Sequence, residues 1–335
     1  MPRAPTLEAT YEAPPNIALV KYWGLRDRAR AIPYNSSISV TLDRLRSRTR
    51  IRFDPALSTD RVTLNGETAT GGPREAVVRF LDRVRGLAQV THGADVQSEN
   101  NFPTASGLAS SASGFAALAG AATAALDLKL SGRELSKLAR FGSGSAARSV
   151  FGGFVEWRAG VLPDGSDCYA RPLFGPGYWP ALVDLVLVVK GAPVKSVRSE
   201  DAMQTTVATS PIYARRLAEL PRRTRRIRAA IRAREPRRLF PLIMEECDSF
   251  REVCETTRPS LDYLTTTSRA LIAEVRSLNR EAGRPIAAYT HDAGAHLHVF
   301  TLTKDVARVR RHLGKMPGVE RTAVLRPGPG GRRIG

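Results

Sequence analysis

The chain has few cysteines and histidines, and this shortage excludes several kinds of metal and disulfide protein. Three cysteines and five histidines occur in 335 residues, without any C-x-x-C pair. The histidines are not grouped with cysteines at ligand spacing, so the sequence predicts no zinc site. Cys247 and Cys254 lie roughly 10 Å apart along an expected helix, too far for a disulfide. His296 and His298 alternate in an expected strand, which favours structural or substrate-facing roles over metal binding.

Long apolar runs are also missing. Residues 1–10 contain no apolar core of a secretory signal. The longest stretch without a charge, residues 100–126, is rich in serine, glycine, alanine and threonine, which argues against a membrane span. The apolar fraction of 42% is ordinary for a globular protein. We therefore expect a cytoplasmic protein that does not associate with membranes.

Lysine is scarce, although the chain is strongly basic. Only seven of its 51 basic residues are lysines, and the formal net charge is +19. Such a charge permits nucleic-acid binding. However, apolar residues recur at helical spacing within the arginine run 215–238, and no aromatic interleaving accompanies it. A solvated helix face is the favoured interpretation of this run, and we expect no nucleic-acid partner. The charge also suits an enzyme that draws polyanionic substrates into a cleft.

The Walker pattern of phosphate loops is absent, yet another small-residue loop is present. Residues 98–119 begin with polar residues and lead through Gly107 into an alanine-rich segment, which indicates a loop opening into a helix. The first N–H groups of such a helix attract anions, and the hydroxyls of Ser110 and Ser111 add ligands for a phosphate or a metal. Close packing of a buried helix is the alternative explanation. The candidate phosphate-binding residues are Pro103, Ala105, Ser106, Gly107, Leu108, Ala109, Ser110 and Ser111.

Periodicity predicts a mixture of strands and helices, and therefore an α+β protein. One strand is expected over 7–20, and others at 37–42, 49–53, 95–99, 151–157, 182–189, 286–290, 297–302 and 321–325. Expected helices span 75–87, 200–210, 211–234, 236–256 and 305–313, with another that begins at Ser131 in a capping box with Glu134. Asn65-Gly66 indicates a hairpin turn. The Gly/Pro-rich segment 175–180 suggests two lobes, 1–178 and 179–335, and the Gly/Pro/Arg-rich tail 326–335 is expected to be mobile.

Three charged residues stand beside small or apolar segments, where they could reach a ligand. Lys21 directly follows the apolar residues 17–20, Arg148 follows the Gly/Ser/Ala loop 142–147, and Asp292 follows an expected strand. Guanidinium gives a fixed fork that matches a carboxylate. Each residue also has a simpler explanation: Lys21 as a side chain leaving the core, Arg148 as a surface charge, and Asp292 as a turn former.

Four segments carry a family resemblance. The pattern P-x-x-x-G-L-x-S-S at 103–111 resembles the phosphate-binding motif of the GHMP kinase superfamily. The longer run 100–115, together with N-I-A-L-V-K-Y-W-G at 16–24, G-S-G-S-A-A-R-S at 142–149 and Y-T-H-D-A-G at 289–294, is similar to the diphosphomevalonate decarboxylases. The resemblance implies a two-lobed GHMP kinase fold. It would have an N-terminal lobe like ribosomal protein S5 domain 2, a ferredoxin-like C-terminal lobe, and an active site in the cleft between them.

The resemblance also implies a reaction and roles for individual residues. In an ATP- and Mg²⁺-dependent decarboxylation of 5-diphosphomevalonate, Asp292 would orient and deprotonate the 3-hydroxyl. Lys21 would keep Asp292 ionised, and Arg148 would hold the substrate carboxylate. Ser111 and Asp292 would contact the metal. The remaining substrate contacts would be Ala18, Tyr22, Ser143, Gly144, Ser145, Arg198 and Met203. Such enzymes are commonly homodimers.

Departures from the family pattern leave the substrate open. Leu25 stands where the family has a second lysine, and the segment Arg198–Met203 matches only loosely the pattern that grips the 5-diphosphate. Arg26 or Arg198 would compensate, or else the substrate is a 5-monophosphate. A mevalonate-type kinase that stops at phosphorylation is a further alternative, against which the joint presence of Lys21, Arg148 and Asp292 argues.

Overall fold

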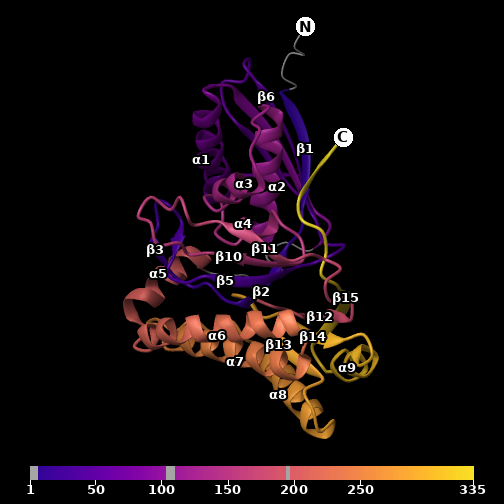
Figure 1. Ribbon diagram of the computed structural model, residues 1–335. Helices are drawn as coiled ribbons and strands as arrows, with labels where there is room; N and C mark the ends of the chain where they lie inside the picture. The colour runs from indigo at the N-terminus through magenta and orange to yellow at the C-terminus, as the bar shows by residue number, and fades with distance from the viewer. Residues whose placement is uncertain (1–6, 103–109, 194–196) are drawn as a thin grey trace.

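The computed structural model describes residues 7–102, 110–193 and 197–335. The chain forms two stacked lobes, with the strands and helices of the first half above and α6, α7, α8 and α9 below in Figure 1. The predicted α+β character is confirmed, because strands and helices come in separate runs and nearly all strand pairs are antiparallel.

The upper lobe is built on a six-stranded sheet of order β16-β1-β6-β9-β7-β8. Its members are β1 (Glu8–Ala13), β6 (Ser47–Asp54), β7 (Arg61–Leu64), β8 (Glu67–Thr68), β9 (Gly93–Asn100) and β16 (Arg332–Ile334). Apolar side chains from one face of this sheet pack on α1 (Gly71–Ala88), α2 (Ser110–Ala125) and α3 (Gly132–Ala139). In β6 buried and exposed residues alternate, as expected of a sheet with one solvated face.

A second sheet lies between the lobes and leads directly to the functional site. Its order is β11-β10-β5-β2, formed by β2 (Asn16–Val20), β5 (Ser37–Thr41), β10 (Phe154–Trp157) and β11 (Ala170–Phe174). Every residue of β2, β5 and β10 is buried. These strands are therefore covered on both faces. The hairpin β3 (Leu25–Asp27) and β4 (Ile32–Pro33) follows β2, and the short α4 (Ala146–Ser149) precedes β10.

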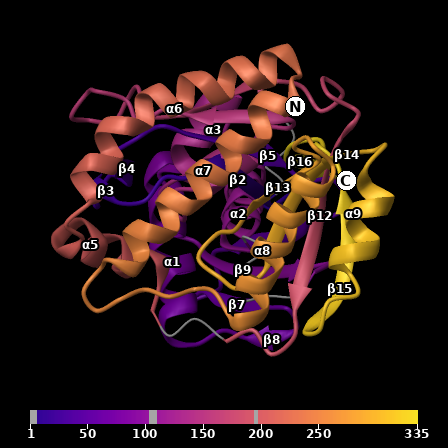
Figure 2. The same ribbon diagram turned by 90° about the horizontal axis from the view of Figure 1, so that it is seen from below.

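The lower lobe contains a third sheet, of order β13-β14-β12-β15. Its strands are β12 (Leu182–Val189), β13 (Ala287–Thr290), β14 (Leu297–Leu302) and β15 (Val319–Leu325). One face packs against α8 (Thr266–Glu281) and α9 (Val306–Leu313). The remaining helices are α5 (Ser199–Thr209), α6 (Tyr213–Ala233) and α7 (Pro236–Glu255). Figure 2 shows α6 and α7 running side by side across the underside of the molecule.

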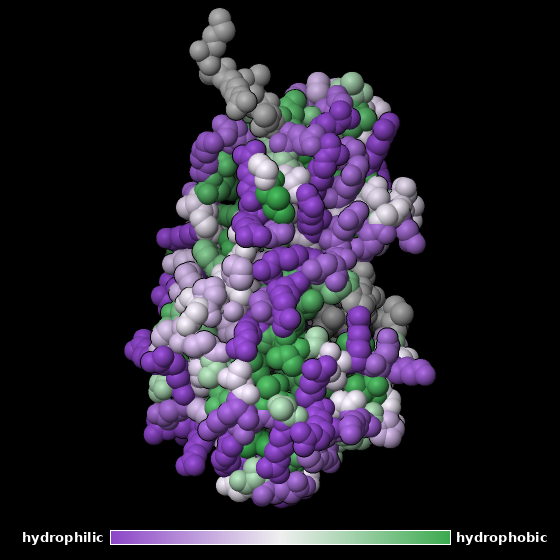
Figure 3. Space-filling model, turned by 90° about the vertical axis from the view of Figure 1, so that its right-hand side faces the viewer, coloured by the Kyte–Doolittle hydropathy of each residue, from purple (hydrophilic) through white to green (hydrophobic). Residues whose placement is uncertain are grey.

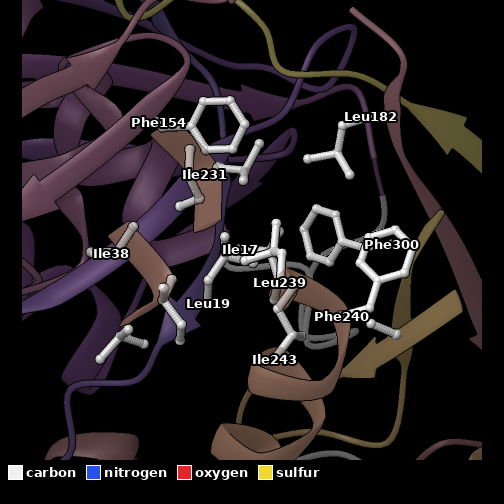
Figure 4. Close-up of a cluster of buried hydrophobic side chains, with 14 of the residues drawn as sticks. Ile17, Leu19, Ile38, Phe154, Leu182, Ile231, Leu239, Phe240, Ile243 and Phe300 are labelled. Atoms are coloured by element: carbon white, nitrogen blue, oxygen red, sulfur yellow. The ribbon is translucent and has the colours of Figure 1, made fainter. Parts of the chain in front are cut away.

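A hydrophobic core joins the two lobes. Figure 4 shows Ile17, Leu19, Ile38 and Phe154 from the second sheet facing Ile231, Leu239, Phe240 and Ile243 from α6 and α7, with Leu182 and Phe300 from the third sheet. All ten residues are buried. The lobes therefore share one core at this level.

Polar side chains cover most of the face drawn in Figure 3. Among the described residues, no helix has the length and hydropathy needed to cross a bilayer.

Several local predictions are confirmed. Asn65 and Gly66 have φ of 49° and 84° and join β7 to β8, as a two-residue hairpin turn requires. Ser131 and Glu134 form the predicted capping box at the start of α3.

Two local predictions are wrong, and a third is only partly right. The tail 326–335 is not loose, because β16 pairs with β1 and Pro327 bridges Leu42. Residues 7–20 form two strands in different sheets, separated by Pro14-Pro15, rather than one. The arginine run is a solvated helix face for most of its residues, as predicted, but Arg216 and Arg223 are buried.

Candidate active site

A buried ion pair joins the two lobes at the centre of the site. Lys21 directly follows β2 and Asp292 follows β13, and Lys21 Nζ lies 2.6 Å from Asp292 Oδ1. The Lys21 side chain is 4% exposed and that of Asp292 is 29% exposed. Burial opposes ionisation of Asp292, but the charge and hydrogen bond of Lys21 outweigh it and leave the pKa of Asp292 below its usual value. Asp292 is therefore a carboxylate at neutral pH, with one edge open to solvent.

Arg148 lies in the same region, fully buried on α4. Its Nε donates to Asn16 Oδ1 at 3.0 Å and its Nη1 donates to Ser37 Oγ at 2.7 Å. Asn16 is itself fixed by donating to the Ser145 carbonyl and to Ser149 Oγ. Burial lowers the pKa of Arg148 to about 10, which still leaves it charged at neutral pH. No carboxylate in the described parts of the chain forms a salt bridge with Arg148, so its charge is available to an anionic ligand.

Aromatic side chains shape the floor of the site. Tyr22 packs edge-on against Trp157, with ring centroids 4.9 Å apart, and Arg148 Cζ lies 5.9 Å from the Tyr22 ring. Burial raises the pKa of Tyr22 to about 12, so its hydroxyl remains a hydrogen-bond donor at neutral pH. A side chain at Gly144 would collide with the Tyr22 hydroxyl, because an added Cβ would lie 2.7 Å from it. The small-residue loop is therefore needed for this packing.

These groups line a small cavity of about 110 Å³. Hydroxyls form one side of it: Ser143 Oγ lies 3.1 Å from Ser145 Oγ and 3.5 Å from Ser111 Oγ. The complete lining is Ala18, Lys21, Tyr22, Trp23, Ser111, Ser143, Ser145, Arg148, Ser199, Met203, Phe250, Asp292 and Ala293. The cavity thus contains a carboxylate, two cations and several hydroxyls.

A larger cavity of about 890 Å³ adjoins the small one. The two share Tyr22, Ser111, Ser143, Ser199 and Met203 in their walls. Five arginines line the larger cavity: Arg28, Arg79, Arg83, Arg140 and Arg198. Ser110 and Ser111, also in its wall, begin α2, where free N–H groups favour anions. The chemistry of this cavity suits a polyphosphate.

Family models match both halves of the chain. Residues 13–170 match the diphosphomevalonate decarboxylase-like N-terminal domain. Residues 184–323 match the mevalonate 5-diphosphate decarboxylase C-terminal domain. The chain belongs to the diphosphomevalonate decarboxylase family.

Relatives of this decarboxylase family resemble the chain over nearly its whole length. The diphosphomevalonate decarboxylase of Candida albicans is 40% identical over 329 residues, which cover 92% of this chain and 90% of the relative. The mevalonate diphosphate decarboxylase structure from Staphylococcus aureus has a TM-score of 0.91 and 35% identity, covering 98% of each chain. A structure of MDDEF in complex with MVAPP, AMPPCP and magnesium has the same TM-score and identity, covering 98% of this chain and 99% of that one. The predicted two-lobed GHMP kinase fold is thereby confirmed.

The structure brings together most of the residues singled out from the decarboxylase motifs. Lys21, Arg148 and Asp292 line the small cavity with Ala18, Tyr22, Ser111, Ser143, Ser145 and Met203. Ser110, Gly144 and Arg198 line the larger one, which Ser111 also borders. The remaining candidates for the phosphate loop, Pro103, Ala105, Ser106, Gly107, Leu108 and Ala109, lie outside the described residues.

Arg26 and Arg198, the two candidates to replace the missing family lysine, differ in position. Arg26 Nη2 donates to the carbonyls of Ala159 and Gly160, and Arg26 lines neither cavity. Arg198 lines the larger cavity and also pairs with Asp201. Arg198 is therefore better placed than Arg26 to meet a phosphate.

Sequence reasoning missed four arginines of the larger cavity, Arg28, Arg79, Arg83 and Arg140. They come from separate segments and belong to no local motif, so only the overall positive charge hinted at them.

The histidines of the lower lobe have structural contacts. His298 Nδ1 lies 2.6 Å from Asp184 Oδ2, and His296 Nδ1 accepts a hydrogen bond from the Val189 N–H. Within the described residues, no three histidines, cysteines or acidic residues cluster as a metal site would require. Cys168, Cys247 and Cys254 are buried free thiols.

Proposed function

We propose that the chain catalyses the ATP-dependent decarboxylation of (R)-5-diphosphomevalonate to isopentenyl diphosphate, ADP, phosphate and CO₂. The observation that carries the proposal is the meeting of the Lys21–Asp292 pair with the buried Arg148 in one cavity, next to a larger arginine-lined cavity. A base, a carboxylate-binding cation and a polyphosphate site are the three parts that this reaction needs. Family membership and the complex of MDDEF with MVAPP and AMPPCP support the same assignment.

The first step is phosphorylation of the 3-hydroxyl. The Asp292 carboxylate accepts the hydroxyl proton as the oxygen attacks the γ-phosphorus of ATP and ADP leaves. Lys21 keeps Asp292 ionised and fixes its direction through the 2.6 Å contact. The arginines of the larger cavity and the start of α2 stabilise the negative charge of the phosphates.

The second step breaks the bond between the substrate carboxylate and its neighbouring carbon. The new 3-phosphate departs from C3 with its bonding electrons, which leaves C3, one carbon further from the carboxylate, electron-deficient. The electrons of the breaking carbon–carboxylate bond then form the alkene, and CO₂ is released. Arg148 aligns the carboxylate for this step, because Asn16 and Ser37 hold its guanidinium in place.

The residues in the small cavity fit a magnesium ion bound mainly through ATP. Ser111 and Asp292 supply oxygen donors, the type that Mg²⁺ prefers. Mg²⁺ commonly uses only one or two protein carboxylates plus substrate phosphates and water, which agrees with the absence of a larger acidic cluster among the described residues. When bound, the ion would neutralise phosphate charge. MDDEF has been solved with magnesium and AMPPCP.

The 5-monophosphate remains the alternative substrate, because Leu25 is buried where the family has a lysine. We propose that Arg198 takes over part of that lysine's role, supported by its place in the wall of the larger cavity. The roles of Ser143, Ser145 and Met203 as substrate contacts are part of the same proposal. A homodimer and a cytoplasmic location stay predictions.

The deciding experiment measures ADP and CO₂ release with Mg-ATP and either (R)-mevalonate 5-diphosphate or the 5-monophosphate. We expect stoichiometric ADP and CO₂ from the diphosphate, with a clear preference over the monophosphate. Preference for the monophosphate would instead assign a phosphomevalonate decarboxylase that yields isopentenyl phosphate. ADP release without CO₂ would leave only a kinase.

A further inference from the structure

Glu246 does not line either cavity, but its carboxylate binds the backbone N–H of Lys21. Its Oε1 accepts a hydrogen bond from the Lys21 N–H at 3.0 Å, and only 1% of the residue is exposed. Lys21 follows β2, whose pairing with β5 shifts register between Ala18 and Val20. Glu246 therefore binds the Lys21 N–H just beyond the point where the strand leaves its ladder.

Two buried arginines fix this carboxylate. Arg216 Nη2 donates to Oε1 of Glu246, and Arg216 Nη1 donates to Oε2 at 3.3 Å. Arg223 Nη1 also donates to Oε2, at 2.8 Å. With the Lys21 N–H, these contacts give each carboxylate oxygen two donors, so any rotation other than the equivalent half-turn would break some of them. Arg216 and Arg223 are 3% and 6% exposed, and the antiparallel packing of α6 and α7 brings them to Glu246 (Figure 2).

The sequence contains no motif that marks this network. Arg216 and Arg223 belong to the arginine run that resembles a solvated helix face, and two of its charges turn inward because Glu246 lies between them and β2. A buried carboxylate with two guanidinium partners is costly to assemble, since each charge loses its hydration. Its net contribution to stability is therefore small, whereas its effect on geometry is large.

We propose that Glu246 is a positioning residue for the reaction, which acts by fixing the backbone of Lys21. Two carboxylates of the lower lobe then bind Lys21: Glu246 accepts a hydrogen bond from its N–H, and Asp292 accepts one from its Nζ. These two hydrogen bonds fix the position of Nζ and hold the end of β2 at a constant distance from Asp292. A displacement of about 1 Å in such a group lowers turnover by up to a hundredfold. The inference rests on the proposed function, because its readout is turnover.

The test is Glu246→Asp, which keeps the charge for both arginines but shortens the side chain by one methylene. We expect kcat for ADP release to fall at least tenfold, while KM for ATP and for the diphosphate stays within about twofold. The matched control is Glu245→Gln. Glu245 is the adjacent carboxylate on α7 and also binds Arg223, at 3.0 Å, but no contact joins it to Lys21. We expect its kcat to stay within about twofold of the wild type.

Melting temperatures and far-UV circular dichroism of all variants separate positioning from stability. A folded Glu246→Asp enzyme with wild-type kcat would overturn the proposal, and so would an equal loss of kcat in Glu245→Gln. If Glu246→Asp does not fold, Arg216→Lys provides the second test, because it keeps the carboxylate and the charge but removes the two-point clamp. We expect a smaller fall in kcat there, and unchanged kcat would contradict the proposal. Wild-type turnover is measured first, so that failure of the proposed function is recognised separately.

Discussion

At the scale of single residues, the environment of Asp292 decides its chemistry. Burial by itself raises the pKa of Asp292, and the Lys21 ammonium at 2.6 Å is the largest of the influences that lower it below its usual value. Arg148 also depends on its neighbours: burial lowers its pKa, and Asn16 and Ser37 accept hydrogen bonds from two of its N–H groups. Each charge is useful because the fold supports it without neutralising it fully.

Replacing Asp292 by asparagine removes the base while it preserves the shape of the side chain. We expect kcat to fall at least a hundredfold, since general-base catalysis contributes about 10² to 10⁴, while ATP binding is retained. Single-turnover ADP release and nucleotide binding by calorimetry measure the two effects. Asp262→Asn is the control, because Asp262 is an exposed residue whose side chain forms an ion pair with Arg269. Substantial residual decarboxylation would remove Asp292 from the mechanism.

At the scale of elements, the sequence predicted most strands and helices but not how they associate. The hairpin at Asn65-Gly66 and the capping box at Ser131 depend on local geometry, so neighbouring residues suffice to predict them. The tail 326–335 has a mobile composition, yet it pairs with β1 from the far end of the chain. Such pairing depends on residues distant in sequence. The inward turn of Arg216 and Arg223 was missed for the same reason, because their partner Glu246 lies on another helix.

The residues of the site also differ in whether the sequence could predict them. Lys21, Arg148 and Asp292 stand in motifs that resemble a family, so the sequence could indicate them. Arg28, Arg79 and Arg140 reach the larger cavity only through the packing of separate segments, and their spacing along the chain carries no signal. Motifs therefore indicated the charged residues that meet in the small cavity, while the arginine lining of the larger cavity needed the structure.

A buried histidine between the end of β12 and the start of β14 should make the stability of the protein depend on pH. His296 Nδ1 accepts a hydrogen bond from the Val189 N–H, which requires a neutral ring, and burial lowers the pKa of His296 to about 4. Between the usual value of about 6.5 and about 4, the unfolded chain binds a proton that the folded chain does not. The free energy of unfolding therefore falls as the pH drops through this window, by about 3 kcal/mol at most for this residue.

His296→Asn tests this dependence, because the asparagine Oδ1 can accept the same hydrogen bond without titrating. We expect the loss of stability between pH 6.5 and 4 to become smaller in the variant, measured by urea unfolding at several pH values. The free energy of unfolding should still depend on pH in the variant, because burial also lowers the pKa of His291 to about 4. An unchanged slope would show that His296 titrates normally in the folded protein.

At the scale of the whole molecule, the core between the lobes keeps the residues of the site in their relative positions. Lys21 and Asp292 come from different lobes, so their 2.6 Å contact lasts only while the lobes stay in register. That register depends on side chains such as Phe240, which is fully buried between the second and third sheets (Figure 4). A shared core of this kind predicts that the two lobes unfold together rather than one after the other.

Phe240→Ala tests this coupling. Removing a buried phenylalanine ring costs about 3 to 5 kcal/mol, and because the core is shared, we expect one calorimetric transition at a lower temperature. Leu87→Ala is the control, since Leu87 on α1 is 57% exposed and its truncation should change stability by less than about 0.5 kcal/mol. Two separate transitions in the wild-type protein would contradict this coupling and show that the packing within each lobe stabilises that lobe on its own. The Lys21–Asp292 contact, rather than the apolar residues, would then be what keeps the cleft closed.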